Sequence, residues 1–270
     1  MFRTRLRGIT LTDIFVWLIG IVILIGMIWG SVATLRLGKY SLSTWTDLIV
    51  TGLALGGVYA LIALGYTLVY GILRMINFAH SEVFMSGAFT ATFVATGLLN
   101  IGWWNRLPVL SLLLVMMVAA LVSATVAFLV ERIAYRPLRN APRLVPLITA
   151  IGASFFLQYA FRGLYGSGLK GYPEMEILKG EIVFLGIRFL KTQFVVIAGA
   201  VIMMAILYSI VQYTKMGKAM RAVSEDKETA ALMGIDVDRT ISTTFMLGGA
   251  SAGIAGILYL VLFPVAHFFL

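Results

Sequence analysis

The sequence predicts an all-α fold, namely a polytopic transmembrane helical bundle with about seven membrane helices. One observation is composition: 60% of the residues are hydrophobic and 12% are charged, with a mean hydropathy of +0.97, which excludes an ordinary soluble domain. Another is spacing, because a bilayer core of about 30 Å requires about 20 apolar residues per helix, and such stretches recur along the chain. We expect these helices at residues 14–35, 47–72, 76–99, 108–131, 144–165, 192–213 and 241–263.

The distribution of charge gives the expected topology. The net charge is +9, but the basic residues are scattered at helix ends and do not form one patch. We therefore interpret them as topology signals and not as a nucleic-acid surface. Arg3, Arg5 and Arg7 precede the first helix, and further basic residues gather in 132–143 and 214–240. This pattern predicts a cytoplasmic N-terminus.

Particular residues support individual helices. The apolar core of the first helix is long for a signal peptide, and no convincing cleavage site precedes Arg36, so we expect it to be retained. The fourth helix follows Trp103 and Trp104, which are typical of the membrane interface. Glycine pairs of the form G-x-x-x-G predict close helix packing. These pairs are Gly26 and Gly30, Gly52 and Gly56, and Gly249 and Gly253.

Three tyrosines mark the second helix. Tyr59, Tyr66 and Tyr70 are spaced by seven and then four residues, so they share one helix face. This face either lines a cavity, with hydroxyl groups for a polar substrate, or packs within the bundle. The same two alternatives apply to Gln158 and Tyr159 in the fifth helix.

The third predicted helix begins with a polar cluster at Asn77, His80, Ser81 and Glu82. If this stretch is helical, Asn77 shares a face with His80 and Ser81. The cluster is either a pathway-lining element, or a helix break near the cytoplasmic interface whose polar groups are satisfied by backbone or water. A proton relay requires further acids at mid-depth, and we find none.

Several kinds of chemistry have no support in the sequence. His80 and His267 are the only histidines, neither has the i, i+4 partner that a helical zinc site requires, and the chain has no cysteine. The phosphate-binding pattern G-x-x-x-x-G-K-[ST] is also absent. We therefore expect no metal, no cofactor and no enzymatic activity, and transport driven by ATP would need another chain to hydrolyse it.

The segment between the sixth and seventh helices, residues 214–240, is the most distinctive soluble piece. Its basic residues from Lys215 to Arg221 are expected to continue the sixth helix into the cytoplasm. Ser224 is expected to cap a second, short helix with two acids in its first turn, and Gly234 is expected to end it. This amphipathic helix either docks into a groove on a partner or lies in the lipid interface, and its acidic residues favour the partner.

Four runs of sequence follow one another in the order found in a known family. They are GLALGGVYALIALGYTLVYGILRMINFAHSE, ERIAYRPLR, AIGASFFLQ and MGKAMRAVSEDKETAALMGIDVDRTISTTFMLGGASAGIAGIL. Together they extend from about Trp45 to Leu258 and closely resemble a bacterial ABC importer permease for branched-chain amino acids, that of the leucine/isoleucine/valine system. The run INFAHSE is similar to the family's INFAHGE, with Ser81 in place of glycine.

This resemblance implies a multi-pass subunit in the lipid bilayer of the bacterial inner membrane, paired with a second, related permease subunit. Two cytoplasmic ATPase subunits would power it, and a periplasmic substrate-binding protein would deliver the substrate. The family's coupling loop matches Gly217 to Gly234, in agreement with the docking helix above. The ATPase-coupling residues implied here are Gly217, Arg221, Ser224, Glu225, Asp226, Ala230 and Gly234.

The chain departs from the family pattern at both ends, and three alternative functions stay open. Residues 1–44 are expected to form an extension with one membrane helix, and residues 45–270 the permease domain, with the C-terminal part of the family fold missing. Urea or short amides are the alternative substrates within the same class. An ion-coupled secondary transporter is the alternative from another class, although mid-membrane acids are lacking. A non-functional remnant is the third.

Overall fold

A computed structural model describes residues 11–38, 40–139, 141–142, 144–184 and 187–269. Its described residues include seven helices that are long and apolar enough to cross a membrane, which confirms the predicted helical fold. The chain separates into two compact units, with the division between Ile49 and Val50. Helix α1 (Leu11–Arg36) belongs to the first unit, and α2 (Leu42–Leu73) runs from the first unit into the second.

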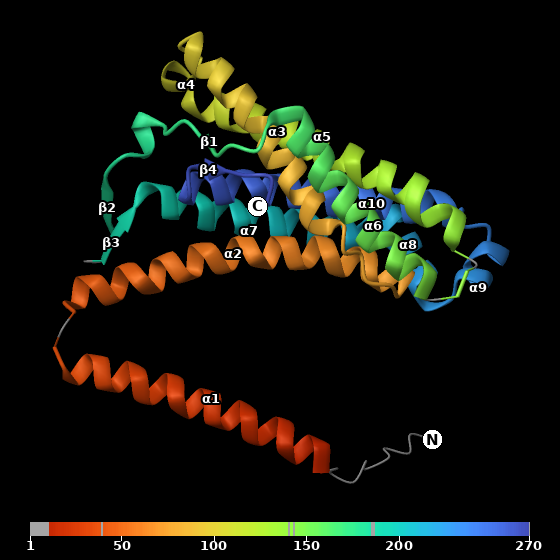
Figure 1. The fold of residues 1–270 in the computed structure, drawn as a ribbon, viewed down its shortest axis with the longest axis horizontal. Coiled ribbons are helices and arrows are strands. Elements are labelled where there is room, and N and C mark those ends of the chain that lie inside the picture. Colours follow the sequence, from red (N-terminus) through yellow and green to blue (C-terminus); the bar gives the residue numbers. More distant parts are fainter. Residues whose placement is uncertain (1–10, 39, 140, 143, 185–186, 270) are drawn as a thin grey trace. The chain divides into compact units, whose positions relative to one another are not determined.

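The core of the second unit is a bundle of three helices, α3 (His80–Asn100), α5 (Pro108–Val130) and α10 (Val237–Leu262). Figure 1 shows α10 in blue beside α3 and α5, and these three helices make extensive contacts with one another. We call them the central bundle. Its helices bury many small side chains along their contact faces, which allow the helix backbones to approach closely.

Two glycines explain how closely α5 and α10 approach. A Cβ atom at Gly253 would lie 2.4 Å from the carbonyl oxygen of Ala119, and one at Gly249 would lie 2.6 Å from that of Ser123. Ser123 also donates a hydrogen bond from its hydroxyl to the carbonyl oxygen of Val83 in α3, at 2.7 Å. The predicted packing role of the Gly249 and Gly253 pair is confirmed.

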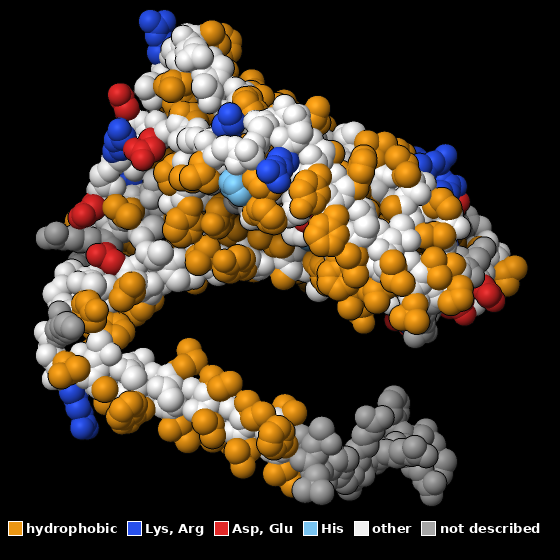
Figure 2. Space-filling view, in the orientation of Figure 1, with side chains coloured by type: hydrophobic (Ala, Val, Ile, Leu, Met, Phe, Trp, Pro, Cys, Tyr) orange, Lys and Arg blue, Asp and Glu red, His pale blue; other side chains and the backbone are white. Residues whose placement is uncertain are grey.

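Within their own units, and among the described residues, the other two predicted glycine pairs do not make such contacts. A Cβ atom at Gly26, Gly30, Gly52 or Gly56 would meet no atom within 4 Å. Their helices α1 and α2 carry many exposed hydrophobic side chains. Apolar side chains also cover much of the surface visible in Figure 2. Such a surface suits contact with hydrocarbon.

The remaining long helices lie against the central bundle with their outer faces exposed. They are α6 (Leu144–Tyr165) and α7 (Lys191–Tyr213). Three short strands lie between α6 and α7, and a fourth follows α10. The sequence did not predict them, because two- to four-residue strands leave no periodic pattern. Strand β1 pairs antiparallel with β4, and β2 with β3. The strands are β1 (Lys170–Gly171), β2 (Glu181–Phe184), β3 (Ile187–Leu190) and β4 (Val265–Ala266).

Short helical elements complete the fold. They are α4 (Trp103–Arg106), the π-helical turn η1 (Glu131–Tyr135), the 3₁₀ turns η2 (Arg136–Leu138) and η3 (Glu176–Leu178), and the helices α8 (Lys215–Glu225) and α9 (Lys227–Leu232). Because α7 leads from β3 to α8, the strand β3 and the α8–α9 pair lie at opposite ends of one membrane helix.

Candidate functional site

The polar cluster begins at a helix break between α2 and α3, and its residues His80, Ser81 and Glu82 form the first turn of α3. We expected a helix from residue 76, but α3 begins at His80, so Asn77 does not share a helix face with His80 and Ser81. The Asn77 side chain takes the place of backbone hydrogen bonds of a regular helix. Its Oδ1 accepts hydrogen bonds from the backbone N–H of Ala79 at 3.1 Å and from the Tyr135 hydroxyl at 2.9 Å. Just upstream, α2 ends at Leu73.

The residues around this break are packed inside the second unit. His80 and Glu82 are buried. The rings of His80 and Tyr66 pack edge to face, with their centroids 5.9 Å apart. The Nε2 atom of His80 has no hydrogen-bond partner among the described residues. Tyr59 and Tyr70, by contrast, are 57% and 48% exposed on α2. A pathway-lining role for these residues stays a prediction.

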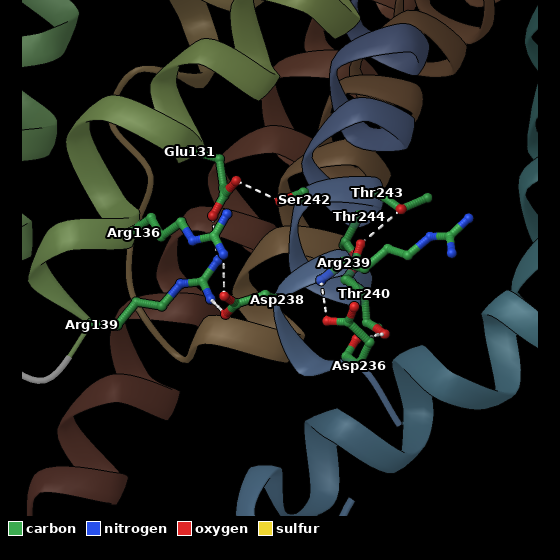
Figure 3. A network of polar contacts seen from close by, with 10 residues as sticks. All are labelled: Glu131, Arg136, Arg139, Asp236, Asp238, Arg239, Thr240, Ser242, Thr243 and Thr244. Atoms are coloured by element: carbon green, nitrogen blue, oxygen red, sulfur yellow. Dashed lines mark hydrogen bonds and ion pairs between the residues drawn. The ribbon is translucent and has the colours of Figure 1, made fainter. Parts of the chain in front are cut away.

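A second polar cluster, which the sequence did not reveal, joins the end of α5 to the start of α10 (Figure 3). We call it the ion-pair network. The Arg139 guanidinium donates to Glu131 and to Asp238, and Arg136 donates to the other oxygen of Asp238. The hydroxyl of Ser242 donates to Glu131 at 2.6 Å. Asp238 and Ser242 lie about a hundred residues from their partners, so no local signal predicts these contacts and only the fold brings them together.

Local backbone structure places Glu131 in this network. The regular helix α5 stops at Val130, and the chain continues through the π-helical turn η1 and the 3₁₀ turn η2, with Pro137 near the start of η2. Such turns break the α-helical register and are frequent at functional sites. Glu131 is fully buried here, whereas Asp238 is about half exposed.

The junction of α7 and α8 differs from the prediction. We expected the basic residues after 214 to continue α7, but Thr214 breaks the helix and caps α8, with its Oγ1 accepting the backbone N–H of Gly217 at 3.0 Å. The Arg221 guanidinium donates to the carbonyl oxygens of Val211 and Gln212. A Cβ atom at Gly217 would lie 2.1 Å from the Val211 oxygen. These bonds hold α8 as a separate helix against the end of α7.

Helix α9 forms where a short helix was predicted, but its cap is a different residue. Ser224 lies in the last turn of α8, and Asp226 caps α9, with its Oδ1 accepting the backbone N–H groups of Glu228 at 2.9 Å and Thr229 at 3.1 Å. The hydrogen bonds from Thr229 lower the pKa of Asp226, because they favour its charged form. Gly234 follows the helix with a φ of +82°, as its predicted stop role requires.

The surface around α9 combines an anchored side with an exposed tip. Ala230 is buried, whereas Leu232 and Met233 are 88% and 79% exposed. A cleft of about 430 Å³ lies between the end of α2 and the corner of α8 and α9. There the Arg74 guanidinium donates to the carbonyl oxygen of Ser224 at 3.1 Å. Two adjacent apolar side chains therefore project from a helix that the rest of the chain holds in place.

The polar residues are not arranged for metal binding. No group of three or more His, Asp or Glu residues that could hold a metal ion occurs among the described residues. The ion-pair network instead joins the turn after α5 to the first turn of α10, through the buried Glu131 and the half-exposed Asp238.

Comparison with known proteins identifies the family. Residues 48–269 match the family described as branched-chain amino acid transport system, permease component. Branched-chain amino acid permease BraD of Pseudomonas aeruginosa is 38% identical over 213 residues, covering 78% of this chain and 69% of BraD. The Escherichia coli K12 permease LivH is 39% identical over 215 residues, which are 77% of this chain and 68% of LivH.

A more distant relative and the absence of a structural match complete the comparison. A probable LivH permease of Methanocaldococcus jannaschii is 31% identical over 201 residues, covering 73% of this chain and 60% of the relative. No solved structure shows significant similarity to the chain. The chain belongs to the family of branched-chain amino acid transport permease components, which are transport proteins and not enzymes.

Proposed function

We propose that this chain is the membrane-spanning permease subunit of an ATP-binding-cassette importer that carries branched-chain amino acids across the bacterial inner membrane. The observation that carries the proposal is the α8–α9 element, an anchored helical corner with an exposed apolar tip in a chain of this family. The relatives are named as branched-chain amino acid permeases, so urea or short amides are not favoured as substrates.

The chain acts in a complex with other subunits. We propose that these are a second related permease, two cytoplasmic ATPase subunits and a periplasmic substrate-binding protein. The sequence contains no G-x-x-x-x-G-K-[ST] phosphate-binding pattern, so ATP is hydrolysed by the partner subunits. In this arrangement the N-terminus and the α8–α9 corner face the cytoplasm, as the basic residues of the inner segments favour.

Docking uses the tip of α9. Leu232 and Met233 insert into an apolar groove of the ATPase, and the acidic side chains Glu225 and Glu228, which are exposed on the same corner, meet basic groups around that groove. Because Ala230 is buried and Asp226 fixes the first turn, α9 keeps its orientation before the partner binds. Preorganisation of this kind reduces the entropic cost of binding.

Replacing both tip residues tests this docking. The double variant Leu232→Asp with Met233→Asp is expected to weaken binding of the purified permease to its ATPase by roughly 30-fold or more, because a buried apolar anchor contributes about 2 kcal/mol or more. Binding is measured by titration with the permease in nanodiscs. The matched control is Leu169→Asp, since Leu169 is 70% exposed in the loop at the other end of α7. Equal affinity of the double variant and the wild-type chain would contradict the docking role.

A further inference from the structure

A small cleft lies at the opposite end of α7 and α10 from the α8–α9 corner. Its volume is about 280 Å³, and it is lined by the start of α7, the end of α10 and residues of the 172–180 segment. Helix α7 leads from the cleft to α8, and α10 begins after α9 and ends at the cleft. With the α8–α9 corner in the cytoplasm, as proposed above, the cleft lies on the periplasmic side.

Part of the cleft lining is aliphatic. Leu260, Val261 and Leu262 come from the last turn of α10, and Leu190 is the last residue of β3, directly before α7. Burial of apolar surface is favourable in proportion to its area. Aliphatic residues of this kind therefore suit a small branched side chain, such as that of leucine, isoleucine or valine.

Two opposite charges line the same cleft. The Lys179 Nζ atom lies 3.8 Å from the Glu174 Oε2 atom, and the two side chains are 63% and 64% exposed. An exposed ion pair of this length contributes little to stability, so the two groups are available to other partners. A free amino acid carries one ammonium group and one carboxylate. Glu174 and Lys179 offer a charge-assisted partner to each of them.

Two buried hydrogen-bond donors belong to the lining residues Trp104 and Tyr172, whose rings pack edge to face with centroids 5.7 Å apart. Among the described residues, neither the Trp104 Nε1 atom nor the Tyr172 hydroxyl has a hydrogen-bond partner. Burial raises the pKa of Tyr172, so its hydroxyl stays protonated and can donate. Unpaired buried donors are costly and rare in native proteins. Two of them on residues that line one cleft indicate an acceptor that comes from outside the chain.

A neighbouring groove lacks these polar groups. It has a volume of about 560 Å³, lies between α5 and α7, and shares Met175 and Leu178 with the cleft. No polar or charged side chain lines it, and most of its lining residues belong to membrane-spanning stretches of α5 and α7. A zwitterion would lose its hydration there without compensation. The smaller cleft, by contrast, combines aliphatic side chains with groups for both charges of an amino acid.

We propose that the cleft is an entry site that binds one free branched-chain amino acid before it crosses the membrane. The aliphatic side chain of the ligand lies against Leu260 and Leu262. Its ammonium group pairs with Glu174, and its carboxylate accepts hydrogen bonds from Lys179 and Tyr172. Binding moves lining side chains aside, because the Tyr172 hydroxyl is shielded from solvent in the structure. The identity of the ligand rests on the proposed function.

The first experiment measures leucine binding to the full-length chain in nanodiscs by saturation-transfer NMR, without ATP and without partner subunits. Tyr172→Phe removes the unpaired hydroxyl and keeps the ring, and we expect it to raise the dissociation constant for leucine roughly 10-fold. The midpoint of thermal unfolding is expected to stay the same or to rise, because no hydrogen bond within the described chain is lost. Tyr213→Phe is the matched control, since Tyr213 is 72% exposed at the other end of α7.

The second experiment assigns the two charges with leucine analogues. Lys179→Gln is expected to weaken leucine binding roughly 10-fold and to leave the binding of 3-methylbutylamine, which lacks the carboxylate, unchanged. Glu174→Gln is expected to weaken leucine binding to a similar extent and to leave the binding of 4-methylpentanoate, which lacks the amino group, unchanged. Both side chains are largely exposed, so these variants are expected to fold even if Tyr172→Phe does not.

Absence of saturable leucine binding to the wild-type chain would overturn the inference, as would unchanged affinity in the Tyr172, Lys179 and Glu174 variants. A Tyr172→Phe protein that is less stable but binds leucine as tightly as the wild-type chain would show that the cleft holds water only. Failure of the assembled transporter to import leucine would instead contradict the proposed function. The binding measurement uses neither ATP nor partners, so the two failures are distinguishable.

Discussion

Replacing Gly253 with leucine is expected to prevent stable folding of the second unit. A Cβ atom at this position would already lie 2.4 Å from the carbonyl oxygen of Ala119 and 2.7 Å from the Ser123 hydroxyl. Because the nearest atom belongs to the backbone of α5, relief requires the two helices to separate. We expect a loss of at least about 3 kcal/mol, at the upper end of the range for overpacked cores.

The effect is measured as the yield of monodisperse protein in detergent and as the midpoint of thermal unfolding. Gly152→Leu on α6 is the control, because a Cβ atom there would meet nothing within 4 Å, and it is expected to leave both quantities nearly unchanged. A Gly253→Leu protein as stable as the Gly152→Leu protein would show that α5 and α10 do not pack as described.

Replacing Arg139 with alanine is expected to lower the free energy of unfolding by about 3–5 kcal/mol, which is typical when one partner of a buried pair is removed. The cause is Glu131, whose carboxylate is fully buried and, among the described residues, would keep only the hydrogen bond from Ser242. Stability is measured by chemical unfolding in mixed micelles. Arg136→Ala is the comparison, because Arg136 pairs only with the half-exposed Asp238, and we expect a loss of about 1 kcal/mol or less.

A double variant separates the charge effect from simple loss of contacts. Combining Arg139→Ala with Glu131→Gln removes the buried charge together with its partner, so part of the stability is expected to return. Equal losses in the single and the double variant would contradict the assignment of the destabilisation to an unpaired Glu131 carboxylate.

Much of the fold could be predicted because it depends on long apolar stretches. Each of the seven spans is signalled by about twenty consecutive apolar residues, and the helix boundaries were mostly correct to a few residues. The main error fell at Asn77, where the side-chain Oδ1 accepts the backbone N–H of Ala79 and the regular helical pattern is interrupted. Strands of two to four residues, such as β1 and β4, are too short to produce a pattern.

The candidate site was predicted only where its signals are local. The short helix α9 and its stop at Gly234 follow from capping and glycine preferences. Choosing Ser224 as the cap was wrong, because both Ser224 and Asp226 are good capping residues and only tertiary contacts decide where α8 ends. The ion-pair network was not found, since Glu131 and Asp238 come together only when α5 and α10 pack.

Uptake of radiolabelled leucine tests the proposed function most directly. The measurement uses proteoliposomes that contain this permease with its partner permease, ATPase subunits and binding protein. We expect leucine to accumulate only when ATP is supplied on the side of the membrane that carries the ATPase subunits. Accumulation should continue when the membrane potential is collapsed, because the chain offers no mid-membrane acid for ion coupling. Uptake that follows the membrane potential and continues without ATP would contradict the assignment to an ATP-driven importer.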